Sequence, residues 1–187
     1  KLAKEAVELS VTVPGVQPKI SVGWIKTVLK DGHNGRLTIM DALEGMYILK
    51  PQNFKYDQMP ENEHLSMKLA ELLKIDVVPS NLIRLESGEL CYITKRIDRT
   101  KNEILHMEDM CQLTERLTEN KYHGSYEQIA KAISKYSKTP GLDVVNFFEQ
   151  VLFSFLTGNA DMHLKNFSPI SQTPGIPTLA PAYDMVA

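Results

Sequence analysis

The sequence predicts an α+β fold in which a lobe of antiparallel β-sheet precedes a mainly helical lobe. Residues 11–24 and 35–50 are rich in Val, Ile, Thr and aromatic residues and are broken by Pro and Gly, which is typical of short antiparallel strands. Beyond residue 98 the apolar residues recur at helical spacing instead. We therefore expect a mainly β lobe with one helix at residues 1–97 and the start of a helical lobe at residues 98–187.

One helix and one hairpin are expected within the β lobe. Between residues 60 and 76, four leucines recur at three- and four-residue steps behind Asn62, a candidate N-cap, which predicts an amphipathic helix. Strand-like runs at residues 77–85 and 90–97 are separated by the segment Glu86-Ser87-Gly88-Glu89. A short polar segment with glycine between two such runs predicts a β-hairpin.

The helical lobe is expected to contain a deeply buried final helix. Residues 107–114 are a short helical candidate, and residues 125–136 begin with Ser-Tyr-Glu, which suits a helix N-terminus. Residues 143–156 carry Val, Leu and Phe around nearly the whole circumference, which predicts burial on several sides. Thr157-Gly158-Asn159 should end that helix, and the prolines between residues 169 and 181 predict loops.

Composition argues against several classes of protein. The 187 residues include 21 Lys and Arg against 23 Asp and Glu, so no overall basic field exists to bind DNA or RNA directly. Cys91 and Cys111 cannot build a disulfide framework, and no apolar run is long enough for a membrane span or a signal core. We expect a cytoplasmic protein with no membrane contact. Because the first residue is Lys, we expect a fragment or a partial chain.

The most informative segment is Gly158-Asn159-Ala160-Asp161-Met162-His163-Leu164-Lys165-Asn166-Phe167. It places an acid, an imidazole, a cation and an amide within six residues at the mouth of the last helix. A polar helix-capping loop is one interpretation. The spacing Asp161-x-x-x-x-Asn166 is also that of kinase catalytic loops, in which the Asp accepts a hydroxyl proton and the Asn holds a metal at the phosphates.

Two further segments could complete a nucleotide site. Asp184 alone could be an ordinary turn residue, but with Asn166 it offers the oxygen ligands that Mg²⁺ prefers. Lys50 ends an apolar strand-like run, where it is either an exposed strand-end residue or a lysine that reaches nucleotide phosphates. Glu63 could pair with it, although an exposed glutamate in the first turn of a helix is the simpler account. The turn before residue 20 is weak as a phosphate loop, because it lacks both common glycine-rich fingerprints.

Seven motifs together resemble the HipA family of bacterial toxin–antitoxin serine/threonine kinases. In chain order they are GVQPK (15–19), YILKP (47–51), NEHLSMKLAELL (62–73), KRIDR (95–99), EDMCQ (108–112), GNADMHLKNF (158–167) and LAPAYDM (179–185). The last two are the specific motifs and the others are supportive. The resemblance covers nearly the whole chain from about Ser10, and it implies a two-lobed protein-kinase-like fold whose larger lobe is truncated at its C-terminal end.

The resemblance also implies a role for each matching residue. Asp161 would be the catalytic base, and Asn166 and Asp184 the Mg²⁺ ligands. Lys50 would hold the α- and β-phosphates of ATP. The remaining ATP-binding residues would be Pro14, Gly15, Val16, Gln17, Pro18 and Lys19 in the phosphate loop, Lys95, Arg96 and Ile97 at the adenine, and His163, Leu164, Lys165, Asn166, Tyr183 and Asp184 elsewhere in the lining of the nucleotide site.

Partners and regulation are implied in the same way. Members of the family phosphorylate a protein hydroxyl, for which an aminoacyl-tRNA synthetase is a candidate, and so arrest translation. They pair with a small HipB-like DNA-binding antitoxin, so DNA would be contacted only through that partner. A serine in the phosphate loop is autophosphorylated in the family; here Thr12 stands at that position, which makes Thr12 the candidate site.

Two other classes of function stay open at this stage. The chain could be a catalytically weak nucleotide-binding module, a pseudokinase, although the intact Asp161 argues against it. Asp161, His163 and Asp184 could instead form a transition-metal hydrolase site, although only one histidine is near and zinc sites favour several His or Cys ligands. Residues 121–124, Lys-Tyr-His-Gly, are expected to be a solvated loop.

Overall fold

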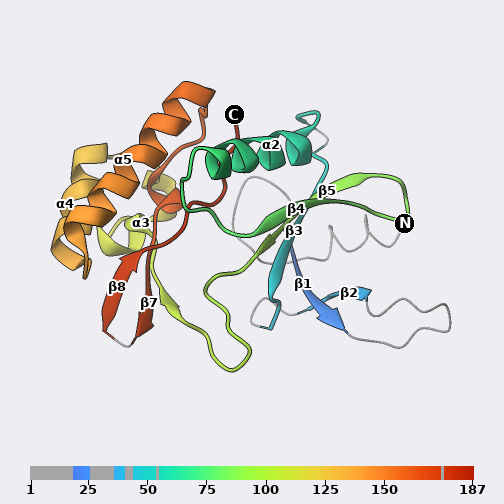
Figure 1. The fold of residues 1–187 in the computed structure, drawn as a ribbon, viewed down its shortest axis with the longest axis horizontal. Helices are drawn as coiled ribbons and strands as arrows, with labels where there is room; N and C mark the ends of the chain where they lie inside the picture. The colour runs from blue at the N-terminus through green and yellow to red at the C-terminus, as the bar shows by residue number, and fades with distance from the viewer. Residues whose placement is uncertain (1–18, 26–35, 41–43, 54, 174) are drawn as a thin grey trace. The chain divides into compact units, whose positions relative to one another are not determined.

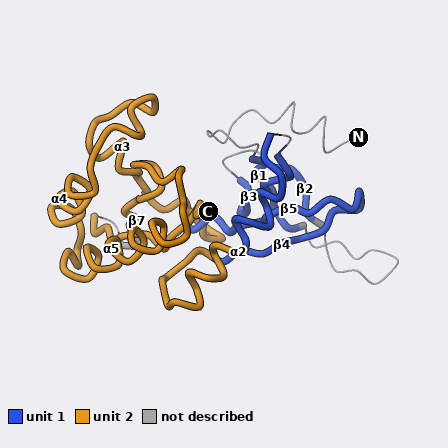
Figure 2. Tube along the Cα trace, turned by 90° about the horizontal axis from the view of Figure 1, so that it is seen from above, with its two compact units in different colours: residues 1–64, 79–97 blue, residues 65–78, 98–187 orange. Residues whose placement is uncertain are grey.

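The computed structural model describes residues 19–25, 36–40, 44–53, 55–173 and 175–187 (Figure 1). Thr12 and the expected phosphate-loop residues 14–18 lie outside these ranges. The chain divides into two compact units: unit 1 comprises residues 1–64 and 79–97, and unit 2 comprises residues 65–78 and 98–187 (Figure 2). None of the described helices is long and apolar enough to cross a membrane.

Unit 1 contains a five-stranded sheet in which every neighbouring pair is antiparallel, as the sequence predicts. The strand order is β2-β1-β3-β5-β4. The strands are β1 (Ile20–Ile25), β2 (Arg36–Ile39), β3 (Tyr47–Pro51), β4 (Ser80–Arg84) and β5 (Leu90–Lys95).

The predicted hairpin joins β4 to β5. The amide of Leu85 donates to the carbonyl of Glu89 and the amide of Gly88 donates to the carbonyl of Leu85, both at 2.9 Å. Gly88 has a φ of +89°, which a glycine adopts at little cost. The buried side chains of Ile20, Val22, Leu49 and Cys91 form the apolar core of this sheet.

The predicted first helix is α2 (Met59–Leu72), which begins earlier than expected. Asn62 lies in its first turn rather than at its N-cap, because the amide of Asn62 donates to the carbonyl of Gln58. The recurring leucines lie on an exposed face in this chain, whereas Met67 and Ala70 are fully buried. The helical period was therefore predicted correctly, but the buried face was not.

Unit 2 combines short helices with a second, three-stranded antiparallel sheet of order β6-β7-β8. Its elements are β6 (His106–Met107), α3 (Met110–Leu113), the 3₁₀ turn η1 (Thr118–Asn120), α4 (Tyr126–Tyr136), α5 (Pro140–Thr157), the 3₁₀ turn η2 (Leu164–Asn166), β7 (Pro169–Thr173) and β8 (Ile176–Leu179). The expectation of loops alone after residue 169 was wrong. Pro169 begins its strand, a position where the missing N–H is tolerated.

The core of unit 2 lies between α3, α4, α5 and the segment around η2. Phe147 of α5 packs edge-on against Phe167, with ring centroids 4.8 Å apart, and Leu164 belongs to the same buried cluster. In Figure 1, α4 lies along α5 and β7 runs beside β8. The carboxylate of buried Asp143 accepts hydrogen bonds from Ser137 Oγ at 2.5 Å and from the amide of Leu179 at 2.8 Å, so the start of α5 is tied to β8.

Burial of α5 on several sides was predicted and is wrong for this chain. Phe147, Gln150 and Phe153 are buried, but the opposite side of the helix is exposed. The exposed residues there are Leu142, Val145, Phe148, Leu152, Phe155 and Leu156. The helix ends as predicted at Gly158, whose φ of +74° gives the left-handed C-cap.

Candidate active site

In unit 1, Lys50 lies in a buried ion pair at the end of β3. Its Nζ is 2.5 Å from Glu63 Oε1, with exposed fractions of 3% and 0% for the two side chains. The ammonium also lies 5.5 Å from the ring centroid of Tyr92, within the range of a cation–π contact. A buried lysine needs such partners because its desolvation is costly. The structure therefore contains the pairing with Glu63, and the exposed strand-end alternative for Lys50 was wrong.

The pKa of Tyr92, beside Lys50, reflects how strongly this region is desolvated. Burial raises the pKa of its phenol, and the nearby carboxylate of Glu63 raises it further. The positive charge of Lys50 acts in the opposite direction but is a smaller effect. Lys50 thus lies in a desolvated interior, where the carboxylate of Glu63 compensates its charge.

The residues expected at the adenine lie where the chain leaves unit 1. β5 ends at Lys95, whose amide donates to the carbonyl of Pro79, and the amide of Arg96 donates to the carbonyl of Met46, both at 2.9 Å. The side chain of Lys95 is exposed. Unit 1 ends at Ile97. Lys19 is half-buried immediately before β1.

In unit 2, Asp161 lies in the loop that follows α5. Asn159 Oδ1 accepts a hydrogen bond from the amide of Asp161 at 3.0 Å, which is a local Asx turn. The side chain of Asp161 is exposed, and its Oδ1 accepts a hydrogen bond from the hydroxyl of Tyr122. The carboxylate of Asp161 is thus exposed to solvent, while the hydrogen bond to Asn159 holds its backbone.

Asn166 closes the same loop through a hydrogen bond of its side chain. Its side chain is buried, and its Oδ1 accepts a hydrogen bond from the amide of His163 at 2.9 Å. A carbonyl oxygen has two lone pairs, so this bond leaves Oδ1 able to accept one further contact. Between these residues, Leu164 is anchored in the core, and its amide donates to the carbonyl of Lys121 at 3.1 Å.

The imidazole of His163 is influenced by burial and by the charges of several neighbouring residues. Burial lowers its pKa most strongly, and the positive charge of Lys121, whose Nζ is 2.8 Å from Nε2, lowers it further. The negative charges of Asp161 and Asp184 act on the same imidazole in the opposite direction. In the part of the chain that the structure describes, Nδ1 of His163 is buried without a hydrogen-bond partner.

Lys165 and Tyr183 direct their polar ends to structural partners. Lys165 Nζ forms an ion pair with the carboxylate of Asp109, the N-cap residue of α3. The hydroxyl of Tyr183 donates to the carbonyl of Lys165 at 3.0 Å and lies 2.6 Å from Ser168 Oγ. Desolvation raises the pKa of the Tyr183 phenol. These contacts brace the segment around Asp184 against the loop of Asp161.

Asp184 itself adopts an uncommon backbone conformation. Its φ is +60°, in the left-handed region that Asp and Asn tolerate better than other non-glycine residues. Such positions are enriched at functional sites, where surrounding structure holds the strained backbone. The bracing by Tyr183 on one side is such a support.

Residues 121–124 form a largely exposed turn, as expected, but the sequence did not indicate that Lys121 and Tyr122 contact the candidate site. The structure places both side chains against the loop of Asp161 and His163, 39 and 42 residues away along the chain. No spacing rule connects segments so far apart. The only available signal was an aromatic residue beside a cation in an otherwise polar turn.

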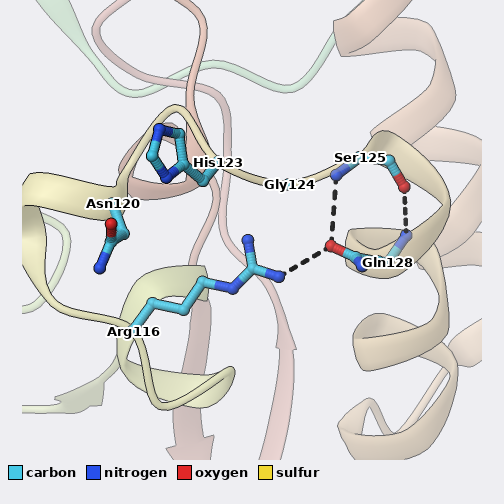
Figure 3. A pocket seen from close by; sticks show the side chains of 6 residues that line it. All are labelled: Arg116, Asn120, His123, Gly124, Ser125 and Gln128. Atoms are coloured by element: carbon cyan, nitrogen blue, oxygen red, sulfur yellow. Dashed lines mark hydrogen bonds between the residues drawn. The ribbon is translucent and has the colours of Figure 1, made fainter.

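A shallow pocket lies beside this turn. It is lined by Arg116, Asn120, His123, Gly124, Ser125 and Gln128 (Figure 3). Arg116 Nη2 donates to Gln128 Oε1 at 2.9 Å, and Gln128 also closes the capping box of α4 with Ser125. Figure 3 shows the Arg116 side chain reaching toward Gln128, so the guanidinium already has a partner within the pocket wall.

The donor set of unit 2 suits Mg²⁺ and phosphate. Asn166 offers an amide oxygen and Asp184 a carboxylate, and Mg²⁺ favours a small number of hard oxygen ligands completed by phosphates and water. No group of three or more His, Cys, Asp or Glu side chains within the described ranges could hold a metal ion.

Known proteins are similar to this chain over most of its length. The model of the HipA-like C-terminal domain matches residues 11–187. A Sinorhizobium fredii protein, "Putative kinase Y4dM", is 34% identical over 192 residues, which cover 96% of this chain and 45% of the relative. The serine/threonine-protein kinase toxin HipA of Shewanella oneidensis is 26% identical, over 91% of this chain and 44% of the relative.

A solved structure shares the fold of this chain. HipA in the complex of Shewanella oneidensis HipA, HipB and operator DNA aligns with a TM-score of 0.69 at 23% identity, over 95% of this chain and 44% of that chain. The chain thus spans about half the length of the relatives it matches. Its fold is the α+β, kinase-like fold of HipA, as predicted. The chain belongs to the family of the HipA-like C-terminal domain.

Proposed function

We propose that the chain is the nucleotide-binding and catalytic part of a HipA-type serine/threonine protein kinase. The observation that carries this proposal is the loop of Asp161, whose exposed carboxylate stands on a backbone closed by the hydrogen bond from the amide of His163 to Asn166 Oδ1 and contacted by Tyr183, the neighbour of Asp184. Kinase-named relatives and the HipA fold support it. Catalysis of this kind rests on positioning and charge stabilisation, because phosphoryl transfer needs little covalent help from the protein.

The proposed roles follow the family resemblance residue by residue. From unit 1, Lys50 holds nucleotide phosphates, and its ion pair with Glu63 fixes the ammonium. From unit 2, Asp161 accepts the proton, and Asn166 and Asp184 hold Mg²⁺, which offsets phosphate charge when bound. The other proposed nucleotide contacts are Pro14, Gly15, Val16, Gln17, Pro18, Lys19, Lys95, Arg96, Ile97, His163, Leu164, Lys165 and Tyr183.

The proposed reaction transfers the γ-phosphoryl group of ATP to a substrate hydroxyl. A substrate hydroxyl oxygen forms a bond to the γ-phosphorus of ATP while the bond from that phosphorus to the bridging oxygen of ADP breaks. The hydroxyl proton passes to the carboxylate of Asp161, and ADP leaves with the bond electrons. Asp161 suits this role because its carboxylate is exposed on a loop whose backbone is fixed at Asn159 and Leu164.

The biological setting is a proposal as well. We propose a HipB-like DNA-binding antitoxin as partner, with DNA bound only through it, and a protein substrate such as an aminoacyl-tRNA synthetase in the cytoplasm. Thr12 is the proposed site of autophosphorylation. A mass shift on the peptide that contains Thr12, after incubation of an active sample with Mg-ATP, tests this last point, and an unmodified peptide contradicts it.

The central test is transfer of labelled γ-phosphate from Mg-ATP to proteins of a bacterial lysate by the full-length protein. We expect labelled protein with the parent and with Glu86→Gln, a control that removes one exposed carboxylate from the β4–β5 turn. Asp161→Asn should abolish the label. Equal labelling by Asp161→Asn would overturn the proposal. Tight ATP binding by the parent without transfer would instead favour the pseudokinase alternative.

A further inference from the structure

The turn between η1 and α4 makes four separate contacts with the loop of Asp161. The hydroxyl of Tyr122 donates a hydrogen bond to Asp161 Oδ1. The Tyr122 ring packs edge-on against the imidazole of His163, with centroids 5.1 Å apart and planes at 71°. Lys121 Nζ is 2.8 Å from His163 Nε2, and the carbonyl of Lys121 accepts from the amide of Leu164. These contacts join two segments that are remote in the sequence.

The position of Tyr122 is unusual for a residue that serves only stability. Its side chain is 54% exposed, so its hydroxyl could be hydrated instead, and an exposed hydrogen bond contributes little net free energy to folding. Asp161 is exposed as well, and without a partner its carboxylate would sample several rotamers. The main consequence of the contact is therefore the orientation of the carboxylate.

The hydrogen bond also has a defined direction. Its acceptor Asp161, followed by burial, raises the pKa of Tyr122 to about 12, so the phenol remains the donor at neutral pH. Within the described residues, the hydrogen bonds of the Asp161 carboxylate involve Oδ1 only. This leaves Oδ2 for an incoming hydroxyl group.

We propose that Tyr122 is a positioning residue that holds Asp161 Oδ1 so that Oδ2 faces the substrate hydroxyl. Lys121 supports Tyr122, because its ammonium lies 4.7 Å from the centroid of the Tyr122 ring and also contacts His163 Nε2. The inference rests on the proposed kinase function and deepens it, since it adds a residue to the proton-accepting step. In this proposal Tyr122 acts through Asp161.

The test uses Tyr122→Phe in the full-length protein, which removes the hydroxyl and keeps the ring against His163. We expect kcat for phosphoryl transfer to fall roughly 10- to 100-fold, in proportion to the loss of a hydrogen bond to a charged group, with the KM for ATP within about twofold of the parent. Tyr126→Phe is the matched control. Its ring packs against Phe147 at the start of α4, and the substitution should leave both constants unchanged.

A second measurement detects the contact without activity. With tyrosine labelled at ¹³Cζ, the Tyr122 resonance, identified by its loss in Tyr122→Phe, should shift in Asp161→Asn, because the hydrogen bond then ends on a neutral amide. The Tyr126 resonance should not move. A purely structural tyrosine would show no such coupling to the chemistry of residue 161.

The outcomes separate the two proposals. A parental kcat in Tyr122→Phe, with Asp161→Asn inactive, overturns the positioning role and leaves the kinase function standing. Loss of folding in Tyr122→Phe also overturns it, because the proposal gives the hydroxyl no part in stability. An inactive parent, or transfer that Asp161→Asn does not impair, removes the proposed function and the positioning role with it.

Discussion

Lys50 and Glu63 form an ion pair that is almost entirely shut off from water. Their charged atoms are 2.5 Å apart, and neither side chain exposes more than 3% of its surface. Removing one member of a buried pair leaves an uncompensated charge, which costs about 3–5 kcal/mol. We therefore expect Glu63→Gln to lower the free energy of unfolding strongly, as measured by guanidinium denaturation.

An exposed pair in the same chain provides the control for this prediction. Lys68 and Glu71 are 2.7 Å apart, but their side chains are 47% and 58% exposed. Exposed pairs add little to stability, so Glu71→Gln should leave the denaturation midpoint nearly unchanged. Replacing both buried partners, in Lys50→Met with Glu63→Leu, should recover part of the loss. Equal effects of Glu63→Gln and Glu71→Gln would show that burial of the pair is unimportant.

The lowered pKa of His163 predicts a specific dependence on pH. In the folded chain the pKa of this imidazole lies below its ordinary value of 6.5, because burial and the charge of Lys121 both oppose protonation. The unfolded chain binds that proton more readily, so His163 makes folding less favourable as the pH falls through 6.5. Stability contributed by the neutral form is fully present above this range.

Removing the positive charge should raise the pKa of His163. We expect this in Lys121→Met, because Nζ lies 2.8 Å from the imidazole in the parent. An NMR titration of the five histidines measures it, with His163 identified by its absence in His163→Gln. Lys131→Met, on the exposed face of α4, should have no effect. Unchanged titration in Lys121→Met would contradict the contact.

The parts of the fold that the sequence predicts are those with local causes. Ser125 caps α4 and Gly158 ends α5 because the backbone conformation at each position is set within a few residues. The hairpin around Gly88 has the same character. By contrast, β7 and β8 depend on pairing between segments that each contain proline, and proline alone suggested a loop.

The candidate site shows the same limit. Spacing alone indicated Asp161 and Asn166, because both lie in one loop. The depth of Lys50 could not be predicted, since a lysine after an apolar run is ordinarily exposed. Tyr122 could not be predicted either, because its contact with Asp161 depends on how α4 and α5 pack rather than on any local pattern.

The two sides of α5 predict opposite results for the same substitution. Phe147 is 4% exposed and packs against Phe167, so Phe147→Ala should lower the free energy of unfolding by about 3–5 kcal/mol through lost contacts and a cavity. Phe155, on the same helix, is 81% exposed. Phe155→Ala should change the stability of this chain by less than about 0.5 kcal/mol. Guanidinium denaturation of residues 1–187 measures both, and similar losses would contradict the orientation of α5.

The two cysteines offer a probe for each unit. Burial, with a smaller effect of Glu89, raises the pKa of Cys91 in unit 1 to about 11, and burial also raises the pKa of Cys111 in unit 2. Because the thiolate is the reactive form and both side chains are buried, alkylation by iodoacetamide at pH 7.5 should be very slow in the folded chain and fast in guanidinium. In the Cys111→Ala variant, the alkylation rate of Cys91 measures the opening of unit 1. In the Cys91→Ala variant, the alkylation rate of Cys111 measures the opening of unit 2. Rapid alkylation of either thiol under native conditions would show that its unit is open far more often than this packing allows.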